Sequence, residues 1–250
     1  MRLRALSLAA LLGLGSGAAA CPEVSEPLLF HSCHGPSRAE IVLLPEDPEP
    51  QADAPRFLAV TGTYTGRDSR GEGLPNPVGL FLRDGRAVNP TLARMDGILL
   101  IGPDRQPSIH VRDDVPVGGL RFDLRDPAAR SAFIAEAGAA RIDVLQSHLL
   151  IRDGRLDLRP VPDAPRYVRR IFFSGPHGYG VWQSPAPLTL YDAAAELART
   201  HAPRMALNLD MGSFDYCWRA EAGPARGCGL RGRGETGALS NLLVLRQTAG

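Results

Sequence analysis

The chain has 250 residues, 44% of them hydrophobic, and 28 Lys and Arg residues face 27 Asp and Glu residues for a formal net charge of +1. Every basic residue is arginine, which excludes lysine chemistry such as Schiff bases, P-loops and Ser–Lys dyads. The near-neutral charge is unlike that of a general nucleic-acid binder, so we expect no nucleic-acid partner.

Residues 1–20 are predicted to be a secretory signal peptide. Two arginines precede an apolar stretch over 6–14, and small residues follow up to Ala20. The stretch is too short for a permanent membrane span, and no later segment is long enough for one. Cleavage after Ala20 predicts a periplasmic or extracellular protein without a transmembrane segment. Cys21 comes next, so a lipoprotein anchored through Cys21 is the alternative. Ala18 argues against this alternative, because lipoprotein signals usually have a larger aliphatic residue at that position.

Short apolar runs predict a series of β-strands. The first spans 40–44 and precedes an acidic, proline-rich loop over 45–55, so residues 21–55 are assigned to an N-terminal segment. Two Arg-Asp-Gly-Arg sequences, at 83–86 and 152–155, suit type I′ hairpin turns. Within a main domain over 56–250, further strands are predicted at 56–63, 78–82, 87–88, 98–101, 108–111, 120–124, 142–145, 149–151, 171–173 and 242–245.

Two segments have helical periodicity. Residues 127–140 begin with proline after Asp126, an N-cap residue. Residues 190–201 follow Thr189, which forms a capping pattern with Asp192. Many short strands with about two helices predict an α+β fold, a single domain of mixed, largely antiparallel β-sheet.

The four cysteines, Cys21, Cys33, Cys217 and Cys228, all follow the predicted cleavage site, and they permit three pairings. We favour Cys21 with Cys33 and Cys217 with Cys228, because each bond would close a short loop. The run from His31 to His34 could instead bind a metal, but no matching ligand pair recurs elsewhere. We predict no cofactor and no metal, with a divalent metal as the open alternative.

Polar residues follow the apolar strands, where a sheet presents functional groups on its loops. In chain order the segments are Thr61-Gly62-Thr63-Tyr64, Asn76-Pro77-Val78-Gly79-Leu80, Gln146-Ser147-His148, Arg166-Tyr167-Val168-Arg169-Arg170 and Asn208-Leu209-Asp210-Met211-Gly212-Ser213. Their order and spacing, from about Arg56 to Leu245, resemble the phosphodiester glycosidase family. That family includes the mannose-6-phosphate uncovering enzyme and secreted bacterial proteins.

The resemblance implies a secreted hydrolase that cleaves glycosyl phosphodiesters, with a small-molecule or glycan substrate. Arg166, Arg169 and Arg170 are candidate phosphate ligands because a guanidinium donates two parallel bonds to phosphate. Strand alternation places Arg170 on the opposite face from Arg169. Asp210 is the candidate base or stabiliser, with a pKa lowered by those arginines. His148 is the candidate proton donor.

Further candidate substrate-binding residues would contact the sugar: Tyr64, Gln146, Ser147, Asn208 and Ser213, which would orient its hydroxyl groups, and Gly62. Each proposed role has a structural alternative. Asp210 could cap the backbone amides of the following turn, and Arg166 and Arg169 could pair with surface acids such as Asp163. Gln146 and Ser147 could simply be polar groups at a strand end.

Five positions depart from the family pattern. Thr61 stands where Asn is usual, Thr63 where Gly is frequent, and Arg170 where some relatives have Asn. His148 and Met211 each replace a glycine. Because glycine often lets backbone approach a ligand closely, Met211 would narrow or refill a pocket. The alternative function is therefore a non-catalytic envelope protein that binds sugar phosphates or anionic glycans.

Overall fold

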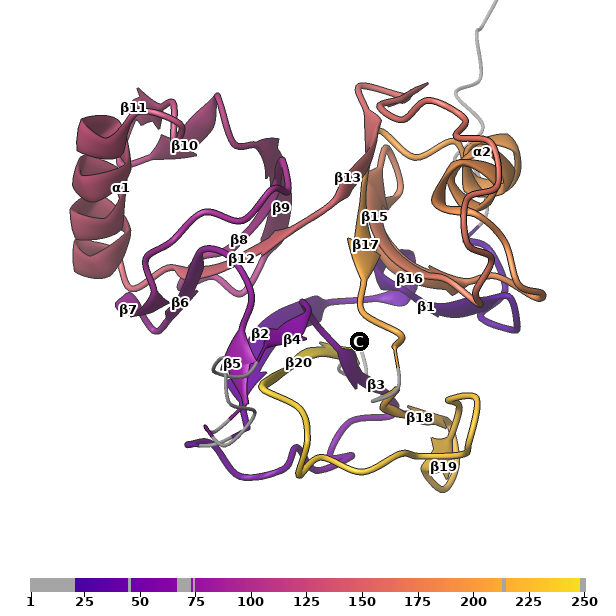
Figure 1. The fold of residues 1–250 in the computed structure, drawn as a ribbon. Coiled ribbons are helices and arrows are strands. Elements are labelled where there is room, and N and C mark those ends of the chain that lie inside the picture. Colours follow the sequence, from indigo (N-terminus) through magenta and orange to yellow (C-terminus); the bar gives the residue numbers. More distant parts are fainter. Residues whose placement is uncertain (1–20, 45, 67–72, 74, 213–214, 248–250) are drawn as a thin grey trace, which may run out of the picture.

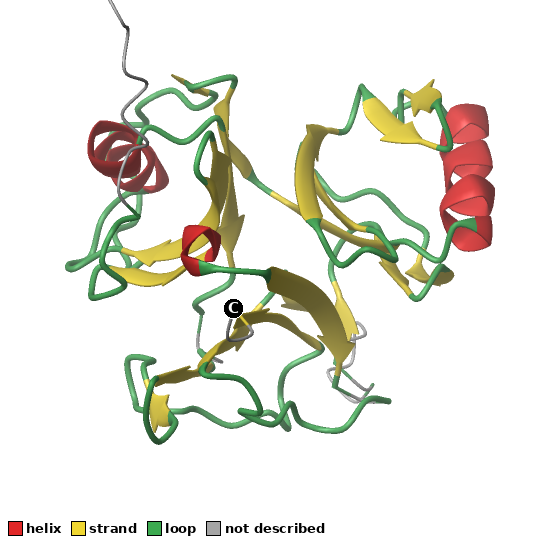
Figure 2. Cartoon of the chain, turned by 180° about the vertical axis from the view of Figure 1, so that it is seen from behind, coloured by secondary structure: helices red, strands yellow, loops and turns green. Residues whose placement is uncertain are grey.

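The computed structural model describes residues 21–247 except 45, 67–72, 74 and 213–214. Within these residues the chain forms three main antiparallel β-sheets and two α-helices, which confirms the predicted α+β class (Figures 1 and 2). No helix of the described residues is long and apolar enough to cross a membrane. The predicted signal peptide and Ser213 lie outside the described residues.

The first sheet has six strands, with helix α2 (Leu190–His201) packed on its outer face (Figure 1). Thr189 caps α2 by accepting a hydrogen bond from the Asp192 amide at 3.0 Å, as the sequence predicts. The strands, in spatial order, are β1 (Leu28–His31), β16 (Gly178–Gln183), β15 (Arg170–Gly175), β17 (Met205–Leu209), β13 (Leu149–Arg152) and β14 (Arg155–Leu156).

The second sheet has five strands and is covered by helix α1 (Pro127–Ala139) together with the hairpin of β10 (Val115–Val117) and β11 (Leu120–Phe122) (Figure 1). Asp126 caps α1, with its carboxylate accepting from the Ala128 amide at 3.0 Å. The strands are β7 (Arg86–Asn89), β6 (Phe81–Arg83), β12 (Asp143–Ser147), β8 (Gly97–Ile101) and β9 (Pro107–Val111).

The third sheet contains the last strand of the described chain. Its strands are β19 (Arg226–Gly227), β18 (Cys217–Glu221), β3 (Arg56–Thr61), β20 (Asn241–Gln247) and β2 (Ser37–Leu43). A small pair, β4 (Thr65–Gly66) with β5 (Asn76–Pro77), and a 3-10 helix, η1 (Ser32–His34), complete the fold. Both predicted disulfides are present, Cys21 with Cys33 and Cys217 with Cys228.

One buried cluster joins the three sheets. Phe172 and Leu207 come from the first sheet, Phe81 and Leu145 from the second, and Val60 from the third, and each is 0% exposed. Burial of large apolar side chains stabilises such a core by about 1.5–3 kcal/mol per residue. Because the three sheets share this core, strand ends from different sheets meet near its edge (Figure 1).

Local signals predict the helices and turns better than the strands. Helix α1 ends one residue earlier than expected, and both Asp-Gly pairs have positive φ at both positions, as a type I′ turn requires. β1, β16 and β18 are absent from the sequence-based prediction. β16 contains glycines that suggest a loop, but Gly180 is needed there because a Cβ would lie 2.6 Å from the Phe30 carbonyl oxygen of β1.

Candidate functional site

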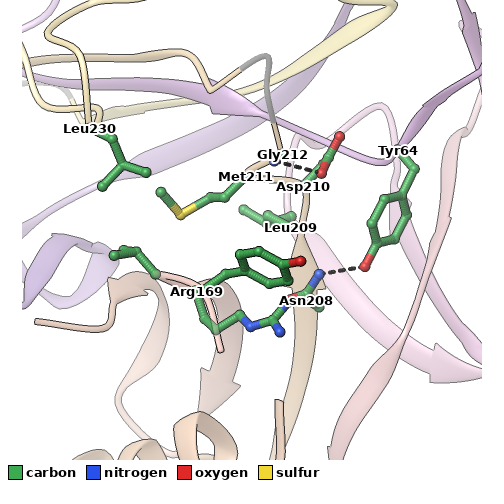
Figure 3. Close-up of a pocket in the computed structure, with 10 residues that line it drawn as sticks. Tyr64, Arg169, Asn208, Leu209, Asp210, Met211, Gly212 and Leu230 are labelled. Carbon is green, nitrogen blue, oxygen red and sulfur yellow. Dashed lines mark hydrogen bonds between the residues drawn. The ribbon is translucent and has the colours of Figure 1, made fainter. Parts of the chain in front are cut away.

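Three of the five predicted strand-end segments, over 61–64, 166–170 and 208–213, contribute residues to a pocket of ≈ 440 Å³ at the junction of the first and third sheets (Figure 3). Its walls come from the turn after β3, the segment before β15, the end of β17 and the loop after β19. The lining residues are Tyr64, Tyr167, Val168, Arg169, Asn208, Leu209, Asp210, Met211, Gly212 and Leu230.

Arg169 and Asp210 are neighbours across two strands. In the antiparallel pair of β15 and β17, Arg170 is the register partner of Leu209. Arg169 and Asp210 are the next residues beyond that pair, and both line the pocket. Strand pairing therefore brings together one predicted phosphate ligand and the predicted carboxylate.

The Arg169 guanidinium is anchored but retains donors. Its Nε donates to the Leu188 carbonyl at 3.1 Å and its Nη2 to the Pro165 carbonyl at 3.0 Å, and it lies over the Tyr167 ring. An arginine has five N–H donors. Three of them have no acceptor within the described part of the chain, and no carboxylate there pairs with Arg169. The pocket thus presents a fixed cation whose remaining donors are available to an anion.

Asp210 follows β17, and its backbone is held by a hydrogen bond from its amide to the Gly62 carbonyl at 2.9 Å. Its Oδ1 accepts from the Gly212 amide at 3.0 Å. Burial raises the pKa of the Asp210 carboxyl above its ordinary value of 3.8, and the amides of Gly212 and Met211 oppose this effect. The predicted lowering by neighbouring arginines is therefore wrong, because desolvation is the larger effect.

Tyr64 and Asn208 form the polar end of the pocket. The Asn208 Nδ2 donates to the Tyr64 hydroxyl at 2.7 Å (Figure 3). Asn208 is 2% exposed, and its Oδ1 is buried with no partner among the described residues. Burial and the charge of Asp210 raise the pKa of Tyr64 to about 12, so its hydroxyl keeps its proton. The protonated Tyr64 hydroxyl can therefore donate to an oxygen of a ligand, whereas the Asn208 Oδ1 is enclosed by protein.

His148 is close to the pocket but does not line it. Its ring meets the Tyr64 ring edge-on, with centroids 5.8 Å apart, and its carbonyl accepts from the Asn208 amide at 3.0 Å. Burial lowers the pKa of His148, which favours the neutral imidazole. His148, the predicted proton donor, therefore packs against the Tyr64 ring instead of lining the pocket.

Arg166 and Arg170 also lie away from the pocket. Arg166 is on the surface, where its Nη2 lies 3.4 Å from Asp192 of α2. Arg170 faces the other side of its strand, as alternation predicts, and is 0% exposed. It donates to Asp215 at 2.8 Å and to the side chain of Gln183. Both arginines have carboxylate partners, and neither lines the pocket.

Gln146, predicted to bind the sugar, instead forms hydrogen bonds to backbone groups of two loops, one before β6 and one before β8. Its Oε1 accepts from the amides of Leu80 and Ala93, each at 2.9 Å, and its Nε2 donates to the carbonyls of Ala93 and Met95. An amide side chain has two donor hydrogens and an acceptor with two lone pairs, so all of them are used. Gln146 is 0% exposed and has no capacity left for a ligand.

Ser147 and Gly62 are structural as well. The Ser147 hydroxyl donates to the Asn208 carbonyl, inside the protein. A Cβ on Gly62 would lie 2.2 Å from Asn241 Oδ1, so glycine is required by packing rather than by a ligand. Asn241 in turn bonds the Thr63 amide at 2.9 Å. These contacts hold the turn that carries Tyr64.

Three site residues were not assigned a role from sequence. Tyr167 lies in the same segment as Arg169, and an aromatic residue beside a candidate phosphate ligand is a signal that could have found it. Asn241, at the start of β20, gives no such signal because its partner Thr63 is far away in the chain. Leu230 lies in an irregular glycine-rich loop that has no periodicity.

The structure contains one close group of possible metal ligands among its described residues, Cys21, Cys33 and His34. The two sulfurs are joined in a disulfide and so cannot act as thiolate ligands. The pocket has a single carboxylate in its lining, Asp210, and no histidine. These residues do not make a multidentate metal site.

No family model matches the chain, and no curated protein matches its sequence. Solved structures with a distantly similar fold include the following two, each with a TM-score of 0.48. One is the catalytic domain of zebrafish N-acetylglucosamine-1-phosphodiester alpha-N-acetylglucosaminidase, auto-inhibited by its pro-peptide, at 12% identity over 88% of this chain and 74% of that one. The other is a hypothetical protein from Synechocystis, at 14% identity over 84% of this chain; the chain spans 57% of that protein.

Proposed function

We propose that the chain is a hydrolase of glycosyl phosphodiesters that acts in the pocket where the segment before β15 meets the end of β17. The observation that carries the proposal is that Arg169, with three donors left for a ligand, and the half-buried carboxyl of Asp210 line the same pocket. An anion and a polyhydroxylated group are the ligands that these two residues, with Asn208 and Tyr64, would recognise.

In the proposed reaction Arg169 holds the phosphate of the diester. Asp210 accepts a proton from a water molecule, whose oxygen bonds to the anomeric carbon of the sugar. The bond from that carbon to the phosphate oxygen breaks, and its electron pair leaves with the phosphate. The products are a free sugar and a phosphomonoester, whose added negative charge Arg169 stabilises.

This reaction does not need a strong general acid. The second pKa of a phosphomonoester is about 6, so the leaving group departs as a stable anion near neutral pH. The position of His148 outside the pocket lining is compatible with a reaction that needs no strong general acid. The raised pKa of Asp210 makes its carboxylate a stronger base than an exposed aspartate.

Incubation in ¹⁸O-labelled water tests the proposal. The substrates are α-glucose and N-acetyl-α-glucosamine 1-(methyl phosphate), with the products examined by mass spectrometry. We expect the label in the sugar, and Asp210→Asn should reduce turnover at least about a hundredfold, within the range ascribed to general base catalysis. Asp153→Asn, at an exposed ion pair far along the first sheet, is the matched control. Label in the phosphate would contradict attack at the anomeric carbon, and no turnover by the wild type would refute the hydrolase.

A second candidate is a protein that binds sugar phosphates without cleaving them. Two observations favour it: Asp210 caps the Gly212 amide, and Met211 lies in the pocket lining. Saturable binding of both methyl phosphodiesters, measured by calorimetry and without any product, would support this candidate.

We also propose that the protein is exported, as the predicted signal peptide suggests. Its two disulfides are compatible with a periplasmic or secreted protein, because cytosolic thiols are usually kept reduced. Mass spectrometry of the protein from culture fractions tests this: a chain that begins at Cys21, found outside the cytoplasm, is expected. A full-length cytosolic chain would contradict it.

A further inference from the structure

A groove of ≈ 390 Å³ lies between the second sheet and the first (Figure 1). All of β9 lines it, so we call it the β9 groove, and β9 lies beside β15 and β17 of the first sheet. The other lining residues are Asp114, Arg121, Arg152, Asp153, Ser174, Arg204 and Met205. The β9 groove shares no lining residue with the candidate active site, because it uses the start of β17 and the active site uses the end.

Three arginines from different segments line the β9 groove. Arg121 belongs to β11, Arg152 ends β13, and Arg204 comes just before β17. All three are exposed to solvent. Because an arginine stays charged at any ordinary pH, the fold gathers three permanent positive charges around one groove.

Arg152 and Arg204 are the least occupied of these arginines. The Arg152 guanidinium has no ion-pair or hydrogen-bond partner among the described residues. The Arg204 Nε lies 3.6 Å from Asp153 Oδ1, too far for a hydrogen bond, and both side chains are largely exposed. Arg121, in contrast, donates through its Nε and Nη2 to the Asp114 carboxylate. A guanidinium has five N–H donors, so Arg152 and Arg204 keep theirs for a ligand.

The two carboxylates of the lining, Asp114 and Asp153, do not cancel this charge, because three guanidiniums face them. The hydrogen bond from Arg121 lowers the pKa of Asp114, and the charges of His110 and Arg152 act in the same direction. Arg152 is therefore close to the pair that Arg121 and Asp114 form. Burial lowers the pKa of His110, which favours the neutral imidazole. The lining of the β9 groove as a whole is positive.

Part of the lining is apolar. Ile109 is buried, and Val111 and Met205 pack against the core cluster that joins the three sheets. A charge beside apolar groups is less well hydrated than one on an open surface, so it attracts an opposite charge more strongly. The arginines of the β9 groove therefore differ from isolated surface arginines.

We propose that the β9 groove is a second binding site of this protein, for a ligand that carries a phosphate or a carboxylate group. Arg152 and Arg204 would hold that group, because a guanidinium donates parallel charge-assisted hydrogen bonds to either oxyanion. The inference is independent of the proposed function, which uses none of the residues of this groove.

Methyl NMR of the full chain, with ¹³C-labelled methionine, tests this inference. Met205 lines the β9 groove, Met211 lines the candidate active site, and Met95 is buried and serves as an internal reference. Met205→Leu and Met211→Leu assign the two signals. The ligands titrated are glucose 6-phosphate, glucuronate and glucose, which share one sugar ring and differ in the group at C6.

We expect at least one of the two anions to shift the Met205 signal in a saturable way, and glucose to leave it unchanged. Arg152→Ala combined with Arg204→Ala should weaken binding of that anion about tenfold or more, the loss expected for charge-assisted hydrogen bonds. Arg226→Ala is the matched control, since Arg226 is an exposed arginine of β19 outside both pockets, and it should bind the anion like wild type.

A shift with only one of the anions supports the site and identifies the group that it recognises. If neither anion shifts the Met205 signal, or if the double variant binds as tightly as wild type, the β9 groove is not an anion site. A shift of the Met211 signal alone would place the anion in the candidate active site. That result would overturn this inference and leave the proposed function unaffected.

Discussion

Removal of the charge of Asp215 should strongly destabilise the fold. Arg170 is 0% exposed and Asp215 is 8% exposed, and their side chains meet at 2.8 Å. Asp215→Asn keeps the shape of the side chain but leaves the guanidinium buried without a counter-ion. Breaking a buried pair in this way costs about 3–5 kcal/mol.

The contacts of Arg170 place the expected loss near the lower end of that range. Its guanidinium also donates to Gln183 Oε1 and to the Tyr216 carbonyl, the latter at 3.1 Å, and these bonds survive the substitution. We therefore expect a loss of about 3 kcal/mol. For a domain of this size, that corresponds to a melting temperature lower by roughly 6–12 °C.

Urea unfolding with the disulfides intact measures this loss, with tryptophan fluorescence as the probe. The control is Asp153→Asn, because Asp153 and Arg204 form a largely exposed pair at 3.6 Å that should contribute little. We expect a clear decrease in the midpoint for Asp215→Asn and none for the control. Asp215 Oδ2 also accepts from the Leu230 amide at 2.7 Å. Equal midpoints for wild type and Asp215→Asn would refute the conclusion that the buried pair holds β15 to the Leu230 loop.

Three further predictions concern the turn, the disulfide and the carboxyl of the site. Gly62→Ala should destabilise by about 1–3 kcal/mol in urea unfolding, because its Cβ would overlap Asn241 Oδ1; an unchanged midpoint would contradict that packing. Replacing Cys217 and Cys228 together by serine should cost roughly 3 kcal/mol, since their bond closes a loop of 11 residues; thermal unfolding that matches wild type would contradict this. The acid limb of the pH profile of kcat/KM should lie above the ordinary Asp210 pKa of 3.8, and a limb below it would contradict the role of burial. Because the folded-state pKa is raised, stability is lost as pH rises through it, so Asp210→Asn should raise the melting temperature at pH 7.

Features set by near neighbours in the chain could be predicted from sequence. Thr189 caps α2 through a residue three positions later, and each Asp-Gly turn is formed by adjacent residues. A short sequence motif therefore includes every residue that takes part in these interactions. Strand-end polarity also identified Tyr64, Asn208, Arg169 and Asp210 as site residues, and all four line one pocket.

Side-chain partners far away in the chain could not be predicted. Gln146 has the same strand-end position as Asn208, yet its amide is used by backbone groups 51 to 66 residues away. The pKa of Asp210 follows from its burial, which depends on how the first and third sheets meet. Arg166 and Arg169 lie three residues apart, yet the fold places Arg166 on the surface beside Asp192 of α2 and Arg169 in the pocket lining.

We propose that Arg169, of the neighbouring arginines, binds the phosphate in a pocket shared with Asp210. Calorimetry with N-acetyl-α-glucosamine 1-(methyl phosphate) tests it most directly, in Arg169→Ala and in the matched variant Arg166→Ala. We predict that Arg169→Ala weakens binding at least about tenfold, the loss expected for charge-assisted bonds to phosphate, while Arg166→Ala binds like wild type. Wild-type affinity in Arg169→Ala, or an equal loss in both variants, would contradict the account.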